Sequence, residues 1–232
     1  MKTMKKLILL GLLMCALMSA PAVATITITP DEQGVGRDWT YQEWTFTTEP
    51  ASMTGIEADA GYQNDNGTPT ADITLTGPIA PLPGWYAGNP TSGHTGYIRG
   101  STITMDLDIP NVIRPEPWYK IIQTEVTYYV QQYVPGVNGL LEALVVAGNE
   151  TYTGTVINDS HVDTGAGWGD VTIEWQIPQI YPVEVVHLYL VDSGVRVDSV
   201  TVATVCVPEP ATLLLLGGAG LVGWLRRRRT IT

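Results

Sequence analysis

The stretch Thr102-Ile103-Thr104-Met105-Asp106-Leu107-Asp108-Ile109 alternates strictly between polar and apolar side chains. Successive side chains of a strand point to opposite faces, so this stretch predicts a strand with one face in a core and one in water. Similar alternation recurs at 122–130, 171–177 and 186–190, and a β-branched run follows at 195–205. Repeated strands of this kind indicate a β-protein.

Weaker strand signals lie at 26–29, 39–47, 73–76 and 151–157. Turn-forming clusters such as Asp192-Ser193-Gly194 separate the strands. Residues 138–147 are an internal stretch with a weak helix-like pattern. Many short strands of similar spacing predict an all-β fold, and we expect a jelly-roll-like β-sandwich. Its long loops would be 77–101 and 158–170.

The first 24 residues have the pattern of a secretory signal peptide. Three lysines precede the apolar run Leu7–Leu17, and Ala22-Val23-Ala24 closes it. Cleavage after Ala24 is favoured over cleavage after Ala20, because a cut after Ala20 would leave Pro21 directly after the scissile bond. We therefore expect the Sec translocon and signal peptidase as partners, an N-terminal signal helix in residues 1–24, and a body that spans 25–207.

The C-terminal segment 208–229 has a different pattern. Pro208, Glu209 and Pro210 precede an uncharged stretch, Ala211–Leu225, and then come Arg226, Arg227, Arg228 and Arg229. As a helix, the stretch would span roughly 22 Å, which is short for a hydrocarbon core of ~30 Å. Each arginine costs roughly 2.5–3.5 kcal/mol at the membrane centre. The pattern predicts a single transmembrane helix over 211–225 with the C-terminus in the cytoplasm.

This order of motif, apolar run and basic end resembles the sorting tail of the PEP-CTERM proteins of Gram-negative bacteria. The likeness is carried by Val207-Pro208-Glu209-Pro210-Ala211-Thr212, by Leu213-Leu214-Leu215-Leu216-Gly217-Gly218 and by the arginines. It covers about a tenth of the chain. The resemblance implies that an exosortase recognises Pro208, Glu209 and Pro210 in the inner membrane. The enzyme would cut nearby and pass the body to the cell surface or the exopolysaccharide matrix.

The body is strongly acidic. Seven of the 12 basic residues lie in the two terminal segments, whereas 22 of the 23 acidic residues lie in 25–207, so the body has a net charge of −17. This charge argues against nucleic acid and anionic membranes as ligands, because both need a basic surface. Cys206 is the body's single cysteine, so the body has no internal disulfide.

The aromatic composition raises the alternative of a carbohydrate-binding module. The chain has 7 Trp and 11 Tyr but one Phe. Tryptophan and tyrosine combine an apolar ring with a polar edge, which suits contacts with sugars. The candidate glycan contacts are Trp85, Tyr86 and Trp168, with Trp85 and Trp168 expected in the Gly-rich loops. A sandwich also buries several tryptophans, so the pattern is open to both interpretations.

Two other kinds of chemistry have weaker signals. Asn64–Gly67 and Asp163–Asp170 offer oxygen ligands for calcium, but neither matches a calcium-loop spacing, so we expect no cofactor and keep calcium as an alternative. The run Ser160-His161-Val162-Asp163 holds the letters of a catalytic triad, but sequence neighbours rarely reach triad geometry. Glu174 with a second carboxylate could support glycoside hydrolysis, and the sequence does not identify that partner.

We therefore interpret the chain as an exported, non-catalytic protein of the cell surface or exopolysaccharide matrix. A carbohydrate-binding module and a glycoside hydrolase are the alternatives.

Overall fold

The computed structural model describes residues 39–59, 64, 66–77, 83–88, 94–111, 118–177 and 181–208. The strands are β1 Trp39–Thr45, β2 Ile56–Glu57, β3 Thr70–Thr76, β4 Gly84–Ala87, β5 Gly96–Pro110, β6 Trp118–Val130, β7 Gly139–Ala147, β8 Glu150–Thr153, β9 Thr155–Asp159, β10 Gly167–Ile177 and β11 Val183–Pro208, and the short helix α2 is His161–Thr164. The predicted all-β class is confirmed.

The expected signal helix 1–24, the weak strand 26–29 and the expected membrane helix 211–225 lie outside the described residues. Within the part of the chain that the structure describes, no helix is long and apolar enough to cross a membrane.

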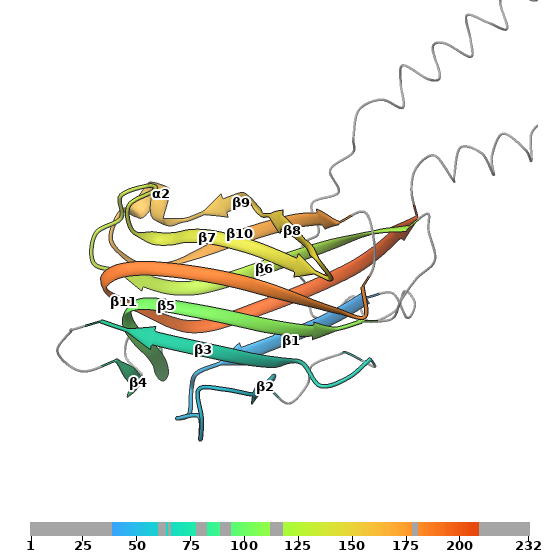
Figure 1. The fold of residues 1–232 in the computed structure, drawn as a ribbon. Coiled ribbons are helices and arrows are strands. Elements are labelled where there is room, and N and C mark those ends of the chain that lie inside the picture. Colours follow the sequence, from blue (N-terminus) through green and yellow to red (C-terminus); the bar gives the residue numbers. More distant parts are fainter. Residues whose placement is uncertain are drawn as a thin grey trace, which may run out of the picture.

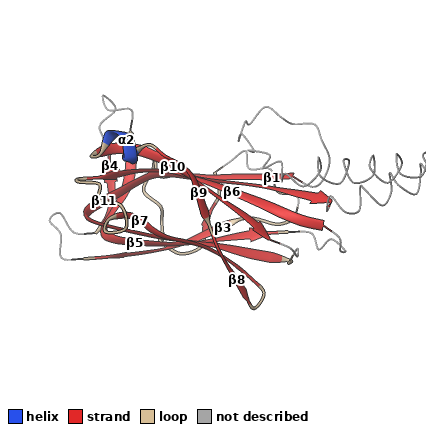
Figure 2. Ribbon diagram, turned by 90° about the horizontal axis from the view of Figure 1, so that it is seen from above, coloured by secondary structure: helices blue, strands red, loops and turns tan. Residues whose placement is uncertain are grey.

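Hydrogen bonds join the strands into one 11-stranded sheet, which folds over into two layers (Figures 1 and 2). The first layer has the order β2-β3-β5-β11-β7-β8, and the second has the order β1-β11-β6-β10-β9. Strand β11 belongs to both layers. Its residues 184–191 pair with β5 and β7, whereas residues 199–205 pair with β1 and β6.

The crossing between layers begins at Asp192-Ser193-Gly194, where the register between β11 and β5 shifts. Here Asp192 is buried, and its Oδ2 accepts a hydrogen bond of 2.7 Å from the backbone N–H of Gln131. The Ser193 hydroxyl donates to Gln131 Oε1 at 2.7 Å. The side chains of Asp192 and Ser193 thus hydrogen-bond to Gln131 next to a bulge, where the regular hydrogen-bond ladder of the sheet is interrupted.

The inward faces of both layers form one apolar core. The alternating side chains that define it are 0–2% exposed: Ile103, Met105, Leu107, Ile109, Val126, Tyr128, Val130, Val171, Ile173, Trp175, Ile177, Val186, Leu188, Leu190, Val200 and Val202. Burying one large aliphatic or aromatic side chain contributes about 1.5–3 kcal/mol to stability. The period-2 pattern in the sequence therefore correctly predicted which face of each strand is buried.

Two predictions about local structure were wrong. Residues 138–147 form no helix, because β7 pairs along its length with β11 and buries Val145 and Ala147 in the core. The stretches 186–190 and 195–205 belong to one continuous strand, β11, instead of two. In both cases, long-range pairing decides the structure and the local pattern does not.

The expected loops contain regular structure as well. Segment 77–101 includes β4 and the start of β5, and segment 158–170 includes α2 and the start of β10. The expected strand 151–157 is divided between β8 and β9 around Gly154. A Cβ at Gly154 would lie 2.4 Å from Ile173 Cγ2, so only glycine fits this close approach to β10.

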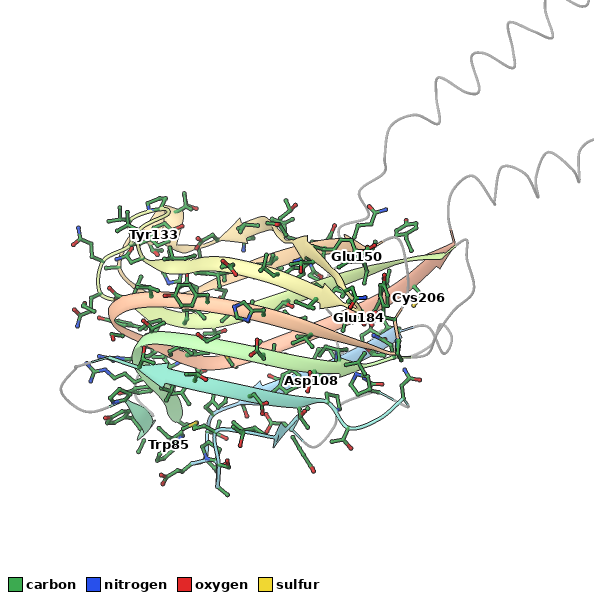
Figure 3. The ribbon with its side chains drawn as sticks, viewed as in Figure 1. Trp85, Asp108, Tyr133, Glu150, Glu184 and Cys206 are labelled. Atoms are coloured by element: carbon green, nitrogen blue, oxygen red, sulfur yellow. The ribbon has the colours of Figure 1, made fainter. Side chains whose placement is uncertain are left out.

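A buried ion pair links the two layers. Lys120 on β6 and Glu184 on the first half of β11 are both fully buried, and Lys120 Nζ lies 2.5 Å from Glu184 Oε2. Burial lowers the pKa of Lys120 and raises the pKa of Glu184, and the charge of each partner opposes the shift of the other. Figure 3 shows Glu184 at the same end of the layers as Cys206.

Lys120→Met is expected to lower the free energy of unfolding by about 3–5 kcal/mol, because it leaves a carboxyl group buried without its partner. The double variant Lys120→Met/Glu184→Met should recover most of this loss, since no buried charge remains. Urea denaturation of the mature protein measures both. The exposed control Glu49→Met should change stability by less than about 0.5 kcal/mol. Equal losses in the single and double variants would show that the two charges are not coupled.

Candidate functional site

Four outward side chains align across neighbouring strands near the crossing between the layers. Trp168 on β10 lies opposite Tyr129 on β6, Tyr129 lies opposite Arg196 on β11, and Arg196 lies opposite Arg99 on β5. Directly opposite residues of an antiparallel pair have their Cβ atoms about 4.5–5.5 Å apart. We call these four residues the arginine–aromatic row. The side chains next to Arg99, Tyr129 and Arg196 on their strands are buried in the core, so these residues lie on the outer face, and Trp168 shares that face because it lies opposite Tyr129.

Two further tyrosines flank the row. Tyr97 precedes Arg99 by two residues on β5, and Tyr86 lies opposite Tyr97 on β4. The rings of Tyr86 and Tyr97 stack with centroids 6.0 Å apart and planes 22° apart. Trp168 receives both Tyr97 and Tyr129 edge to face, at centroid distances of 6.0 and 5.6 Å. The row and its flanking tyrosines are therefore one continuous aromatic cluster.

Arg196 of the row lies against two of these rings, and Arg99 lies opposite it on β5. The guanidinium carbon of Arg196 is 4.5 Å from the ring centroid of Tyr129 and 5.3 Å from that of Tyr97. Such cation–π contacts hold the charge against the ring faces. The Nε atoms of Arg99 and Arg196 are both buried without a hydrogen-bond partner. The cluster thus combines two cations with several aromatic rings.

His94 covers part of the cluster. Its ring stacks on Trp168 with centroids 3.7 Å apart and planes 16° apart. Its Nδ1 lies 3.3 Å from Asp198 Oδ2, and both side chains are mostly buried. This stack and the two tyrosine contacts hold the Trp168 indole in place, while its side chain stays partly exposed.

Of the predicted glycan contacts, the structure brings Tyr86 and Trp168 into this cluster and leaves Trp85 out. Trp85 lies on β4, not in a loop, packs against the core and donates from Nε1 to the Phe46 carbonyl at 2.7 Å (Figure 3). Trp168 likewise lies at the start of β10, not in a loop. The sequence analysis missed Arg99 and Arg196. The sequence feature that could have identified them is that they are two of the few basic residues in an acidic body.

Carboxylates occupy the same outer face beyond the row. Burial raises the pKa of Glu125, and the charges of Asp170 and Glu43 raise it further. Burial also raises the pKa of Glu174, whose Oε2 is buried without a hydrogen-bond partner. Because Glu125 lies opposite Thr172, Glu174 and Glu125 are diagonal neighbours on adjacent strands. Glu125 is therefore a carboxylate beside Glu174 on the neighbouring strand, which the sequence alone could not show.

Ser160, His161 and Asp163 do not form a catalytic triad. His161 is fully buried, and its Nδ1 lies 3.1 Å from Asp159 Oδ1, whereas Asp163 is exposed. The Ser160 hydroxyl accepts a hydrogen bond from the backbone N–H of Asp170 at 2.7 Å. These side chains hold the start of β10 against α2.

The candidate calcium segments also make structural contacts. Asn64 Oδ1 accepts from the Asn66 backbone N–H at 3.0 Å, and Asn64 Nδ2 donates to the Pro110 carbonyl at 2.9 Å. Asp170 Oδ1 accepts from the Thr127 hydroxyl at 2.7 Å. Within the described ranges, no three His, Cys, Asp or Glu side chains are grouped so that they could hold a metal ion. Calcium binding stays an untested alternative.

Comparison with known families places a sorting signal directly after this domain. The PEP-CTERM protein-sorting motif matches residues 207–229, as the resemblance in the sequence predicted. No curated protein matches the chain. The matched segment begins where β11 ends, since β11 runs to Pro208. The motif implies an exported protein that is processed by an exosortase and directed to the cell surface.

Trp85→Phe is expected to lower the free energy of unfolding by about 0.5–1.5 kcal/mol, because the Phe46 carbonyl loses its indole donor. Trp39→Phe is the matched control, since Trp39 stacks on Tyr41 and the phenyl ring can keep that contact. The control should lose less than Trp85→Phe in urea denaturation. The same loss in both variants would mean that ring size, and not the hydrogen bond, determines the effect.

Proposed function

We propose that the chain is a non-catalytic protein of the cell surface or exopolysaccharide matrix whose β-domain binds polysaccharide. The Sec pathway exports it through the signal peptide 1–24, and signal peptidase cuts after Ala24. The helix 211–225 then holds it in the inner membrane, with Arg226–Arg229 in the cytoplasm. Exosortase recognises Pro208, Glu209 and Pro210 and releases the body. The sorting motif at 207–229 supports this route.

We assign the domain to the jelly-roll class of β-sandwiches. Four strands of one layer have the order β1-β11-β6-β10, and four of the other have the order β5-β11-β7-β8. Two packed layers of four strands with this connectivity are typical of jelly rolls, an architecture that includes lectin domains. Strands β2, β3 and β9 then extend the edges.

The arginine–aromatic row is the observation that carries the binding function. It offers an aromatic surface, Trp168 with Tyr129, beside charged donors on one outer face. Sugars present apolar ring faces together with hydroxyl groups, and aromatic side chains with a polar edge are suited to both. We expect the saccharide to lie along the row, across the direction of the strands.

Glu125 and Glu174 favour glycoside hydrolysis as the second candidate, because they are neighbouring carboxyl groups with raised pKa values. The binding proposal expects a bound polysaccharide to remain uncut. Release of reducing ends by the wild type, lost in Glu174→Gln, would favour the enzyme instead.

Processing can be checked by intact mass and cell fractionation in the native host, with and without exosortase. We expect a species from Thr25 to near Pro208 outside the inner membrane when exosortase is present. Without exosortase, or in Glu209→Ala, the species should extend from Thr25 to Thr232 and stay in the inner membrane. A full-length anchored species in both strains would contradict the release step.

Polysaccharide binding can be checked by affinity electrophoresis of the mature protein against neutral and acidic polymers. Trp168→Ala should weaken binding by roughly tenfold or more, because it removes the central ring of the cluster. Trp85→Phe should bind like the wild type, since Trp85 lies outside the cluster. Unchanged retardation of Trp168→Ala would exclude the row as the binding surface.

A further inference from the structure

We propose that the arginine–aromatic row selects acidic saccharides, with Arg99 and Arg196 pairing with the carboxylate of a uronic acid unit. The inference rests on the proposed polysaccharide binding and adds a chemical class of ligand to it. Its basis is the charge environment of the two arginines.

In the part of the chain that the structure describes, every basic side chain other than Arg99 and Arg196 lies beside a carboxylate. His94, Lys120, His161 and His187 each lie within 3.3 Å of an aspartate or glutamate oxygen. Among the described residues, no salt bridge involves Arg99 or Arg196. In a body with 22 acidic residues and five basic ones, two neighbouring arginines that have no acidic partner among the described residues indicate a site for an external anion.

The register places these two like charges directly opposite each other on β5 and β11. Like charges in that position repel and destabilise a sheet. An anion between them would remove the repulsion. The planar fork of a guanidinium matches a carboxylate in a bidentate pair, so a carboxylate is well suited to this position.

The rings decide between an acidic sugar and a simple inorganic anion. Tyr97 and Tyr129 hold the Arg196 guanidinium, and Trp168 contacts both tyrosines. An aromatic surface next to a carboxylate site matches a uronic acid, which has an apolar ring face and a charged edge.

The test compares acidic with neutral polymers, and one of the two pairs differs in charge on the same backbone. Calorimetry of the exosortase-processed protein would compare polygalacturonate with its methyl-esterified form, and alginate with dextran. We expect the acidic polymers to bind roughly tenfold or more tightly than the neutral ones, and added salt to weaken that binding.

Arg99→Gln and Arg196→Gln should each reduce the affinity for the acidic polymers by roughly tenfold. The affinity for the neutral polymers should fall by less, because they present no carboxylate to the two arginines. Arg196→Lys keeps the charge without the bidentate fork and should retain an intermediate affinity. Thr153→Glu, exposed on β8, changes the net charge as Arg196→Gln does and should bind like the wild type. Thermal unfolding of each variant confirms that it is folded.

Equal binding of acidic and neutral polymers, unchanged in the arginine variants, would overturn the charge selectivity and leave the proposed function standing. Binding to none of the four polymers would overturn both. Loss of acidic binding in Thr153→Glu as well would attribute the effect to net charge, and would also overturn the assignment to Arg99 and Arg196.

Discussion

The structure depends on one strand that serves both layers. Strand β11 lies between β5 and β7 in its first half and between β1 and β6 in its second half, so it is the inner strand of two four-stranded groups. Disrupting the pairing of either half of β11 would remove an inner strand from one of the layers. The body has no internal disulfide, so this covalent continuity, the Lys120–Glu184 pair and hydrogen bonds such as that from Trp44 Nε1 to the Ile56 carbonyl join the layers in addition to apolar contact.

The same constraint creates the candidate site. A residue of β11 can have a neighbour from each layer only where the strand crosses between them. Arg196 meets this condition, because it lies opposite Tyr129 of β6 and opposite Arg99 of β5. The arginine–aromatic row therefore takes its side chains from strands of both layers, and the register of β11 with β5 and β6 brings them together.

The sequence predicts which face of a strand is buried, because that depends on residues close together in the chain. It does not predict which strands pair or in what register. Alternation correctly identified the buried faces of β5, β6 and β10, since each strand carries its own pattern. It could not show that β11 crosses between layers, because a turn-like Asp192-Ser193-Gly194 can end a strand or bend it. Trp168 was identified from its residue type alone. Its neighbours Tyr129 and Arg196 come from β6 and β11, 39 and 28 positions away in the sequence, and only strand pairing reveals them.

The position of the row also suits a protein that is processed at its C-terminus. Arg196 and Pro208 lie on the same strand, twelve residues apart, and a strand rises about 3.3 Å per residue, so roughly 40 Å separates the row from the sorting motif. The crossing and the end of β11 are at opposite ends of the layers (Figure 1). An exosortase acting at Pro208 would thus work far from the row. A body tethered through its C-terminus would present the row at the end facing away from the tether, where an extended polymer can reach it.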